Sequence, residues 1–306
     1  MTFHKLSNPN TSSKIEGKVI ALGCFDGFHL GHRGVISAAI QLSRSLSAEP
    51  SVFCFNKPPA SYAPNSNVMI LGGDDRLNIF KDCGISSVYI VDFPEIKNID
   101  AEEFIQKILI EHCSARGVVC GFNFKFGKDR AGTPDLLKQY FGDNTITLEP
   151  VYFNEAPISS SRIRSALSEG NIELANQMLG RNYSIESLVS SGRQDGRKLG
   201  FPTINQIPDS QRAIPASGVY VTKTTLPDGN VYKSITDVGV APTLDKTGII
   251  RLETHILDTE ISYQPSFIKV EFLSRIRPEK HFDSVDALKN QISSDSEYAR
   301  NYFAIN

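Results

Sequence analysis

A glycine-rich segment with two histidines, GCFDGFHLGH, holds the residue types in this sequence that most clearly suggest chemistry. It spans residues 23–32 and places His29 and His32 around Gly31, where a helical pattern begins. Helix N-termini favour anions, because backbone amides and the helix dipole point at the ligand. Two imidazoles there could contact phosphate oxygens and stabilise charge on a transferring phosphoryl group. On these residues alone, a glycine turn with two surface histidines is the alternative.

A second glycine-rich segment, GRQDGRKLGFPTIN, covers residues 192–205. Its glycines alternate with basic residues, a composition that can cradle nucleotide phosphates, although the spacing is not that of a Walker A loop. Thr203 and Asn205 then offer two neutral oxygen ligands. Such ligands suit Mg²⁺, which takes one or two protein ligands and completes its shell with phosphates and water. A glycine-rich hairpin before a polar strand is the alternative.

The elements that must position the first segment alternate between strand and helix. Apolar runs at residues 18–22, 51–55, 88–92 and 118–121 predict strands, and stretches of helical periodicity separate them. This alternation predicts a parallel, doubly wound α/β sheet. Ligands bind such sheets outside the carboxyl ends of the strands, where residues 23–32 are expected.

Two helix starts between these strands carry capping signals. Asp100 and Glu103 indicate a capping box. Thr133 followed by Pro134 indicates an N-cap and a first helical residue.

Short alternating segments replace this pattern after about residue 183. The expected elements are a hairpin with its turn at residues 227–229, strands at 219–225, 231–236, 251–258 and 267–275, and one helix at about 284–293. They predict a small antiparallel β-barrel with a terminal helix. On the strand at 251–258, Glu253 shares a face with Arg251 and His255.

Length and composition limit the classes of protein. At ~150 residues per domain, 306 residues suggest two domains, which we expect to span 1–182 and 183–306. A net charge of −2 provides no basic field for nucleic acid. No apolar run approaches the ~18 residues of a membrane span. The five cysteines are odd in number and form no CxxC, which favours a reducing cytosol. We therefore expect a cytoplasmic protein with no nucleic-acid or membrane partner.

The motifs of the first half resemble a known enzyme family. Residues 23–32 are similar to the HxGH signature of the nucleotidylyltransferase superfamily, in the form G-x-F-D-G-x-H-x-G-H. That form resembles the FMN adenylyltransferase module of bacterial bifunctional riboflavin kinase/FAD synthetases. Residues 121–127, GFNFKFG, and 158–164, ISSSRIR, resemble its next two motifs, G-x-(D/N)-F-x-F-G and I-S-S-T-x-I-R.

The second half resembles the riboflavin kinase module of the same family. The PTIN sequence at residues 202–205 matches its PTxN core. The segments GVY, VGVAPT, LETH and RIRP follow in the family's order, at 218–220, 238–243, 252–255 and 275–278. The resemblance extends from about residue 18 to residue 304.

The resemblance implies that ATP phosphorylates riboflavin to FMN, and that a second ATP adenylylates FMN to FAD. It makes Glu253 the catalytic base of the kinase, with Thr203 and Asn205 holding Mg²⁺. His29 and His32 become the catalytic pair of the adenylyltransferase. Further expected contacts are Gly23, Phe25, Gly31, Ser160, Arg162 and Arg164 to ATP in the adenylyltransferase, Asn123 and Phe124 to the flavin there, and Gly196, Arg197, Lys198 and Gly200 to ATP in the kinase.

Four positions depart from the family pattern, of which Ser161, in place of a frequent Thr, is a mild change. Cys24 stands where Asn or another small polar residue is usual, Asp237 where Asn is common, and Ala241 where Arg is common. An enzyme with one active module is therefore an alternative, as is a non-catalytic flavin-binding regulator. The expected partners are riboflavin, FMN and ATP, and the expected assembly is a monomer or a weak homo-oligomer.

Overall fold

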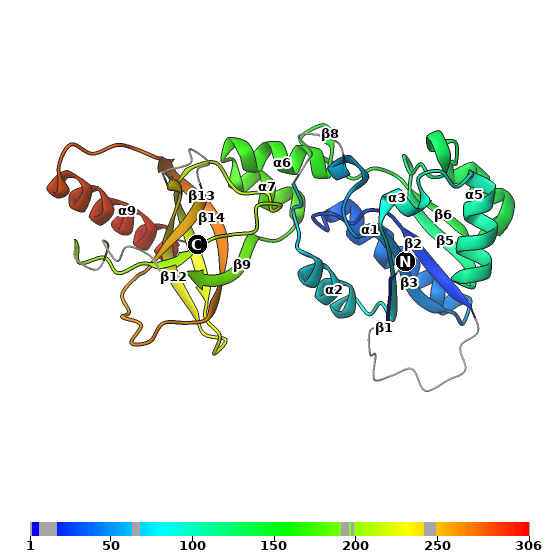
Figure 1. The fold of residues 1–306 in the computed structure, drawn as a ribbon, viewed down its shortest axis with the longest axis horizontal. Coiled ribbons are helices and arrows are strands. Elements are labelled where there is room, and N and C mark those ends of the chain that lie inside the picture. Colours follow the sequence, from blue (N-terminus) through cyan, green and yellow to red (C-terminus); the bar gives the residue numbers. More distant parts are fainter. Residues whose placement is uncertain are drawn as a thin grey trace. The chain divides into compact units, whose positions relative to one another are not determined.

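The computed structural model describes residues 2–5, 17–62, 68–190, 196, 199–241 and 249–305. The chain divides into two compact units, Met1–Ser160 and Ser161–Asn306 (Figure 1). Each unit is built around its own sheet, and each is described separately below.

A six-stranded sheet forms the centre of the first unit, in the order β1-β4-β3-β2-β5-β6. Its strands are β1 (Thr2–Lys5), β2 (Lys18–Leu22), β3 (Glu49–Phe55), β4 (Ser87–Val91), β5 (Ala115–Gly121) and β6 (Thr145–Leu148). The last five run parallel, whereas β1 pairs antiparallel with β4 at the edge. The predicted parallel α/β sheet is confirmed, and β1 and β6 are strands that the sequence pattern did not indicate. A hairpin of β7 (Tyr152–Phe153) and β8 (Ala156–Pro157) follows β6.

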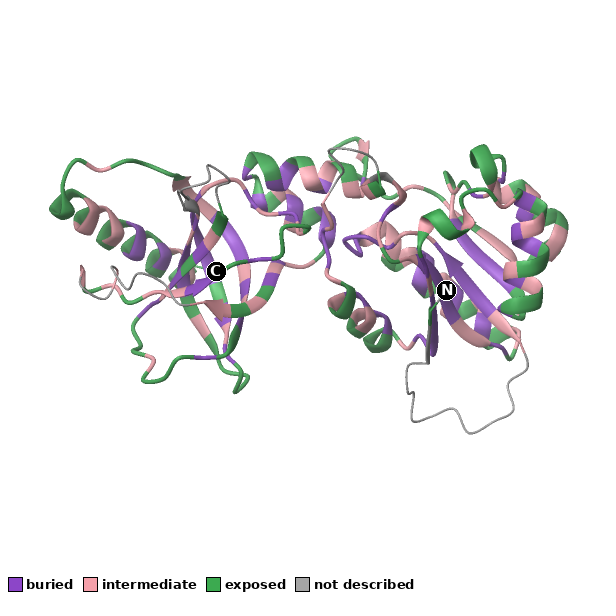
Figure 2. Ribbon diagram, in the orientation of Figure 1, coloured by how far each residue is buried: buried purple, intermediate pink, exposed green. Residues whose placement is uncertain are grey.

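Helices cover both faces of this sheet, because alternate residues of each strand point to opposite faces. They are α1 (Leu30–Ser45), α2 (Gly73–Asp82), α3 (Phe93–Ile96), α4 (Ala101–Glu103), a π-helix (Phe104–His112) and α5 (Pro134–Phe141), with 3₁₀ turns at Pro59–Tyr62, Lys128–Arg130 and Gly142–Asn144. Val19 and Ala21 pack with residues of α1 and α2. Ile20 and Leu22 pack with the π-helix and α5. Figure 2 shows the buried strands between helices whose outer faces are exposed.

The two capping predictions have different outcomes. The Thr133 side chain accepts a hydrogen bond from the Leu136 amide at 3.3 Å, and α5 begins at Pro134, as predicted. Asp100 precedes α4, but within the described chain its side chain makes no capping bond, so the predicted capping box is wrong. The physical reason lies at Glu103, whose carboxylate bonds Lys107 at 2.6 Å instead of turning back to the cap.

A closed β-barrel forms the centre of the second unit, in the order β10-β13-β12-β11-β14-β9. Its strands are β9 (Tyr183–Ser190), β10 (Ile204–Gln206), β11 (Gly218–Thr225), β12 (Val231–Ala241), β13 (Ile249–Ile256) and β14 (Phe267–Pro278). Every neighbouring pair is antiparallel. The predicted barrel and its hairpin turn are confirmed, and Gly229 has the positive φ of 84° that such a turn favours.

Two helices precede the barrel, α6 (Ser160–Glu169) and α7 (Ile172–Leu179). The Asn176 side chain donates to the Phe272 carbonyl at 2.8 Å, and Arg275 donates to the Glu169 carbonyl at 3.2 Å. These contacts join both helices to β14. The two compact units divide between residues 160 and 161, at the start of α6. The boundary predicted after residue 182 falls after both helices in the sequence, and it stays a prediction.

The two faces of the barrel strands differ in chemistry. Inside the barrel, buried hydroxyls bond one another across neighbouring strands, with oxygen–oxygen distances of 2.7–2.9 Å, and the residues are Thr222, Thr224, Ser234, Thr236 and Thr254. Outside, Val219 and Val221 pack against Ala299 of α9 (Val285–Ile305). This packing explains why α9 is much longer than the predicted helix, since its second half is held by the barrel.

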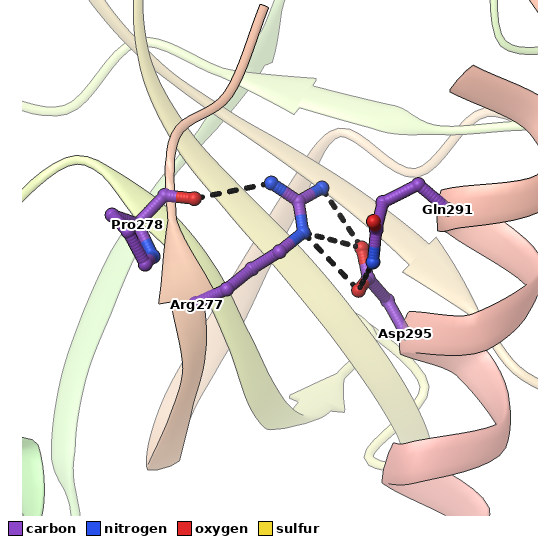
Figure 3. A network of polar contacts seen from close by, with 4 residues as sticks. All are labelled: Arg277, Pro278, Gln291 and Asp295. Carbon is purple, nitrogen blue, oxygen red and sulfur yellow. Dashed lines mark hydrogen bonds and ion pairs between the residues drawn. The ribbon is translucent and has the colours of Figure 1, made fainter. Parts of the chain in front are cut away.

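A buried ion pair fastens α9 to β14 (Figure 3). The Arg277 guanidinium contacts both carboxylate oxygens of Asp295, at 2.9–3.2 Å, and Gln291 donates to the same carboxylate at 2.8 Å. Arg277 also donates to the Pro278 carbonyl at 3.1 Å. The Asp295 side chain is only 3% exposed and that of Arg277 18%, so water contributes little to the charge of Asp295.

We predict that Asp295→Ala lowers the free energy of unfolding by about 3–5 kcal/mol, because it leaves the Arg277 charge buried without its partner. Circular dichroism during urea denaturation measures this in a chain without Trp. The control is Arg300→Ala, which removes an exposed pair between α9 and Asp258 and should cost at most ~1 kcal/mol. Equal losses in both variants would contradict the prediction.

Two candidate active sites

The segment 23–32 forms the turn between β2 and α1, at the carboxyl end of a central strand of the sheet. His29 is the N-cap of α1, and its Nδ1 accepts a hydrogen bond from the His32 amide at 3.3 Å. The two imidazole rings stack, with centroids 3.7 Å apart and planes 16° apart. Both rings therefore lie at the helix N-terminus, where an anion is favoured.

Bare glycines make this arrangement possible. A Cβ on Gly31 would lie 3.2 Å from Cε1 of His29, and a Cβ on Gly23 would lie 3.2 Å from the Phe25 ring. Phe25 itself has a φ of 51° and Phe28 a φ of 45°, a strained region for aromatic residues. Both rings are buried, and their packing holds the strained turn in place.

Asp26 links this turn to two other segments of the first unit. Its buried carboxylate accepts the Ile70 amide at 2.9 Å, and its carbonyl accepts the Ser160 hydroxyl at 2.7 Å. Ser160, expected at ATP, is thus brought to the histidine turn. Arg162 and Arg164 belong to the second compact unit, in the first turn of α6. Their contact with ATP stays a prediction.

Arg76 of α2 is a supporting residue that sequence reasoning missed. Its guanidinium is buried and donates to the carbonyls of Phe55 at 2.9 Å, Asn56 at 3.2 Å and Cys24 at 3.4 Å. These carbonyls lie where β2 and β3 end. The contact between Arg76 and Cys24 holds the backbone of the histidine turn. In the sequence, the only signal for this role of Arg76 is a basic residue four positions before Phe80.

Aromatic residues gather at the carboxyl ends of the neighbouring strands. After β3 and β4, the ring of Phe93 contacts those of Phe55 and Tyr62, with centroids 5.7 and 6.2 Å apart. After β5, Asn123 is exposed and Phe124 stacks on Phe126 at 5.6 Å. Asn123 and Phe124 were expected at the flavin, whereas Tyr62 and Phe93 were not singled out.

In the second unit, strand pairing brings the predicted kinase residues together. Asn205 of β10 lies opposite Glu253 of β13, which lies opposite Asp237 of β12. Residues directly opposed on paired strands share a face, so the three side chains form a row across the barrel. Thr203 lies just before β10, and its Oγ1 is 3.5 Å from Nδ2 of Asn205.

A tight glycine turn precedes this row. The Phe201 amide donates to the Gly196 carbonyl at 2.8 Å, and a Cβ on Gly196 would collide with the Phe201 carbonyl oxygen. Gly200 has a φ of 88°, which favours glycine. Arg197 and Lys198, expected at the ATP phosphates, lie outside the described residues.

His255 fixes the segment between the turn and the row. Its Nδ1 is 2.9 Å from the Pro202 carbonyl, and its ring meets the Phe201 ring edge-on at 5.5 Å. From the sequence, His255 was expected only to share a strand face with Glu253. In the structure, its contacts with Phe201 and Pro202 hold the segment that leads to Thr203.

A cavity of about 350 Å³ opens beside Thr203 and Asn205. Its wall comes from β9, from the end of β13 and from the loop of residues 259–265. The lining mixes apolar side chains such as Ile256 and Ile261 with polar ones such as Ser262 and Gln264. Sequence reasoning missed this loop because it carries no motif.

The electrostatics of the row centre on Asp237. Burial raises the pKa of Asp237 to about 7, with smaller contributions from the nearby carboxylates of Glu279 and Glu253. The Arg277 guanidinium acts in the opposite direction and lowers this pKa. Asp237 is therefore largely protonated in the folded protein at mildly acidic pH.

We predict that Asp237→Asn changes how stability depends on pH. The folded protein holds this proton more tightly than the unfolded chain, where the pKa is near its ordinary value of 3.8. The wild-type contribution is thus full below that value and is lost as pH rises through about 7. Urea denaturation should show a decline on the order of 4 kcal/mol that Asp237→Asn lacks. The same decline in both proteins would contradict the raised pKa.

Together, the two sites define a protein with two nucleotide-binding modules, and comparison with known proteins identifies its family. Residues 11–162 match the family model for FAD synthetase, and residues 179–303 match the model for riboflavin kinase. A bifunctional riboflavin kinase/FMN adenylyltransferase from Buchnera aphidicola is 32% identical, over 99% of this chain and 97% of its own. One from Bacillus subtilis is also 32% identical, over 94% and 92%. The chain belongs to the family of bifunctional riboflavin kinase/FMN adenylyltransferases.

A solved structure shares the fold of the whole chain. It is a crystal structure described as a macrolide-efflux protein from Streptococcus pneumoniae, with a TM-score of 0.86 and 32% identity. The match covers 96% of this chain and 97% of that one. Among the helices described here, none is both long and apolar enough to cross a membrane.

Proposed function

We propose that this chain phosphorylates riboflavin to FMN in its second unit and adenylylates FMN to FAD in its first, using ATP for both reactions. The observation that carries the proposal is the cross-strand row, which sets Glu253 beside Asn205 and close to Thr203. Membership in the bifunctional family supports both activities.

In the kinase reaction, Glu253 accepts the proton of the riboflavin 5′-hydroxyl as its oxygen attacks the γ-phosphorus of ATP, and ADP leaves. Glu253 is exposed on its strand, so a substrate hydroxyl can reach it. The pairing of β10 with β13 fixes the distance between this base and the phosphates held near Thr203 and Asn205. Such positioning and charge stabilisation supply most of the lowering of the barrier in phosphoryl transfer.

Thr203 and Asn205 fit a magnesium site in their donor chemistry. Each offers one neutral oxygen, and Mg²⁺ bound with ATP needs only one or two protein ligands. Among the described residues, no group of three or more His, Cys, Asp or Glu side chains could hold a metal ion, so an all-protein cage is not the alternative here. When bound, Mg²⁺ neutralises charge on the β- and γ-phosphates.

The cavity beside Thr203 is the best candidate for the rest of the ATP molecule. Its volume of about 350 Å³ is in the usual range for small-molecule pockets. Apolar side chains such as Ile261 can pack on the adenine ring, and Ser262 and Gln264 can bond its edge. The phosphates would then extend towards Thr203 and the glycine turn.

In the adenylyltransferase reaction, a phosphate oxygen of FMN attacks the α-phosphorus of ATP, and pyrophosphate leaves. The FMN phosphate is already an anion, so no general base is needed. His29 and His32 donate hydrogen bonds to the α-phosphate as its charge increases, and the amides at the start of α1 add to this stabilisation. The aromatic rings after β3, β4 and β5 offer flat surfaces for the flavin.

The proposed setting is the cytoplasm, with riboflavin, FMN and ATP as partners. All five cysteines lie in the described part of the chain, and no disulfide joins them, which is typical of a reducing compartment. The direct test of the function is incubation with riboflavin, ATP and Mg²⁺, followed by chromatographic separation of riboflavin, FMN and FAD. FMN without FAD would restrict the chain to kinase activity, and neither product would overturn the proposal.

For the kinase, we predict that Glu253→Gln reduces FMN formation by ~10²-fold or more, because it keeps the shape and removes the base. Adenylylation of supplied FMN should continue. The matched control is Glu186→Gln, an exposed change on β9 that should leave both rates unchanged. Near-normal kinase activity in Glu253→Gln would remove Glu253 from the mechanism.

For the metal, we predict that Thr203→Val weakens the use of Mg·ATP, because Val has a similar volume but no ligand oxygen. Added Mg²⁺ should restore part of the rate. Isothermal titration calorimetry should show that metal-free nucleotide binds almost as before. If the binding of metal-free nucleotide falls as much as that of Mg·ATP, Thr203 is not a metal ligand.

For the adenylyltransferase, we predict that His32→Ala reduces FAD formation from FMN by ~10²-fold, the usual cost of removing one preorganised donor. FMN formation from riboflavin should stay near the wild-type rate. His112→Ala, an exposed change at the end of the π-helix, serves as the control. Equal FAD formation in wild type and His32→Ala would refute the role of His32.

A further inference from the structure

Asp237 and the proposed catalytic base are direct neighbours. Asp237 on β12 is the register partner of Glu253 on β13. The Cβ atoms of opposed residues in antiparallel strands lie ~4.5–5.5 Å apart, so the two carboxyl groups can interact. A third carboxylate approaches from the end of β14, since a Cβ on Gly239 would lie 3.3 Å from Oε1 of Glu279 and 3.8 Å from Oδ2 of Asp237.

Charged groups from three elements face Asp237. From β13 come Glu253 and, on the same strand face, Arg251. From β14 comes Arg277, and Glu279 follows directly after that strand. From α9 comes Asp295. The positive charge of Arg277 is already shared with Asp295, which it contacts through both oxygens. The net effect of burial and of these charges is to raise the pKa of Asp237.

One oxygen of Asp237 lacks a hydrogen bond among the described residues. Its Oδ1 is buried, and within the described residues it has no hydrogen-bond partner. An ionised carboxylate in that position would lose hydration without replacement, whereas a neutral carboxyl group loses far less. Burial, the missing partner and the neighbouring carboxylates all favour the protonated form.

We propose that Asp237 is a positioning residue of the kinase reaction, which works as a neutral carboxylic acid beside Glu253 and slows phosphoryl transfer when it ionises as the pH rises through neutrality. The proposal rests on the kinase function proposed above. While Asp237 keeps its proton, Glu253 carries the only charge of the pair and accepts the substrate proton. When Asp237 gives that proton to solvent, a second anion stands beside the site that must bind the phosphates of ATP.

The pH profile of kcat/KM for FMN formation tests this proposal. In the wild type, kcat/KM should fall by about tenfold per pH unit on the alkaline side, once Asp237 ionises. Asp237→Asn, which is neutral at every pH, should lack this fall. Glu279→Gln should move the fall to lower pH, because loss of a neighbouring negative charge makes Asp237 easier to ionise. Glu186→Gln, with the same change of charge on β9, should follow the wild type.

A second measurement does not depend on activity. Carbon-13 labelling of aspartate side chains should reveal one carboxyl resonance that titrates near neutral pH in the full-length wild type and is missing in Asp237→Asn. Its midpoint should fall in Glu279→Gln. If every aspartate titrates in the ordinary acidic range, the proposal is overturned, whether or not the Asp237→Asn protein folds.

The outcomes separate this proposal from the function on which it rests. Kinase activity whose alkaline fall persists in Asp237→Asn would overturn the role of Asp237 and leave the kinase function standing. A chain that forms no FMN at any pH would overturn both.

Discussion

Hydrogen bonding between neighbouring strands fixes the register of the barrel, and the kinase site depends on that register. Thr236 and Thr254 are register partners inside the barrel, where their hydroxyls bond at 2.9 Å. The next pair along the same strands is Asp237 and Glu253, which point to the opposite face. A slip of one residue would break the hydroxyl contact and turn Glu253 into the barrel interior. The buried hydroxyls thus secure the position of Glu253, the proposed catalytic base, one residue away.

In the first unit, the equivalent constraint is support for a strained turn. Phe25 and Phe28 adopt positive φ angles, and the ring of Phe80 packs edge-on against both at 5.6 and 5.9 Å. Phe80 lies on α2, one turn after Arg76, whose guanidinium holds the Cys24 carbonyl. One helix therefore supplies both the apolar and the polar contacts that stabilise the turn beneath the stacked histidines.

Much of this could be predicted from the sequence, because the strands of the parallel sheet and the hairpin of the barrel carry strong local patterns. The run at residues 18–22 and the turn at 227–229 depend on nearby residues alone. What escaped prediction depends on tertiary contacts. The terminal helix extends because Ala299 packs on the barrel, and the capping box fails because Lys107 competes for Glu103. Arg76 and the cavity loop of residues 259–265 have no motif, since their roles arise only when distant segments meet.

The two proposed ATP sites differ in the sign of the charge around them. Around the histidine turn lie imidazoles, helix amides and the buried guanidinium of Arg76, whose described partners are carbonyls. The one carboxylate of the turn, Asp26, is buried and accepts the amides of Ile70 and Leu71. This environment attracts phosphate directly. Around the kinase row, Glu253 and Glu279 add negative charge to a site that must also accept a polyanion. A bound divalent cation would offset this repulsion beyond what Arg277 supplies, and two neutral oxygens from Thr203 and Asn205 can hold it without adding further charge. In the role proposed for Asp237, the aspartate adds no charge to that row while it stays neutral, and its shape differs little from that of Asn.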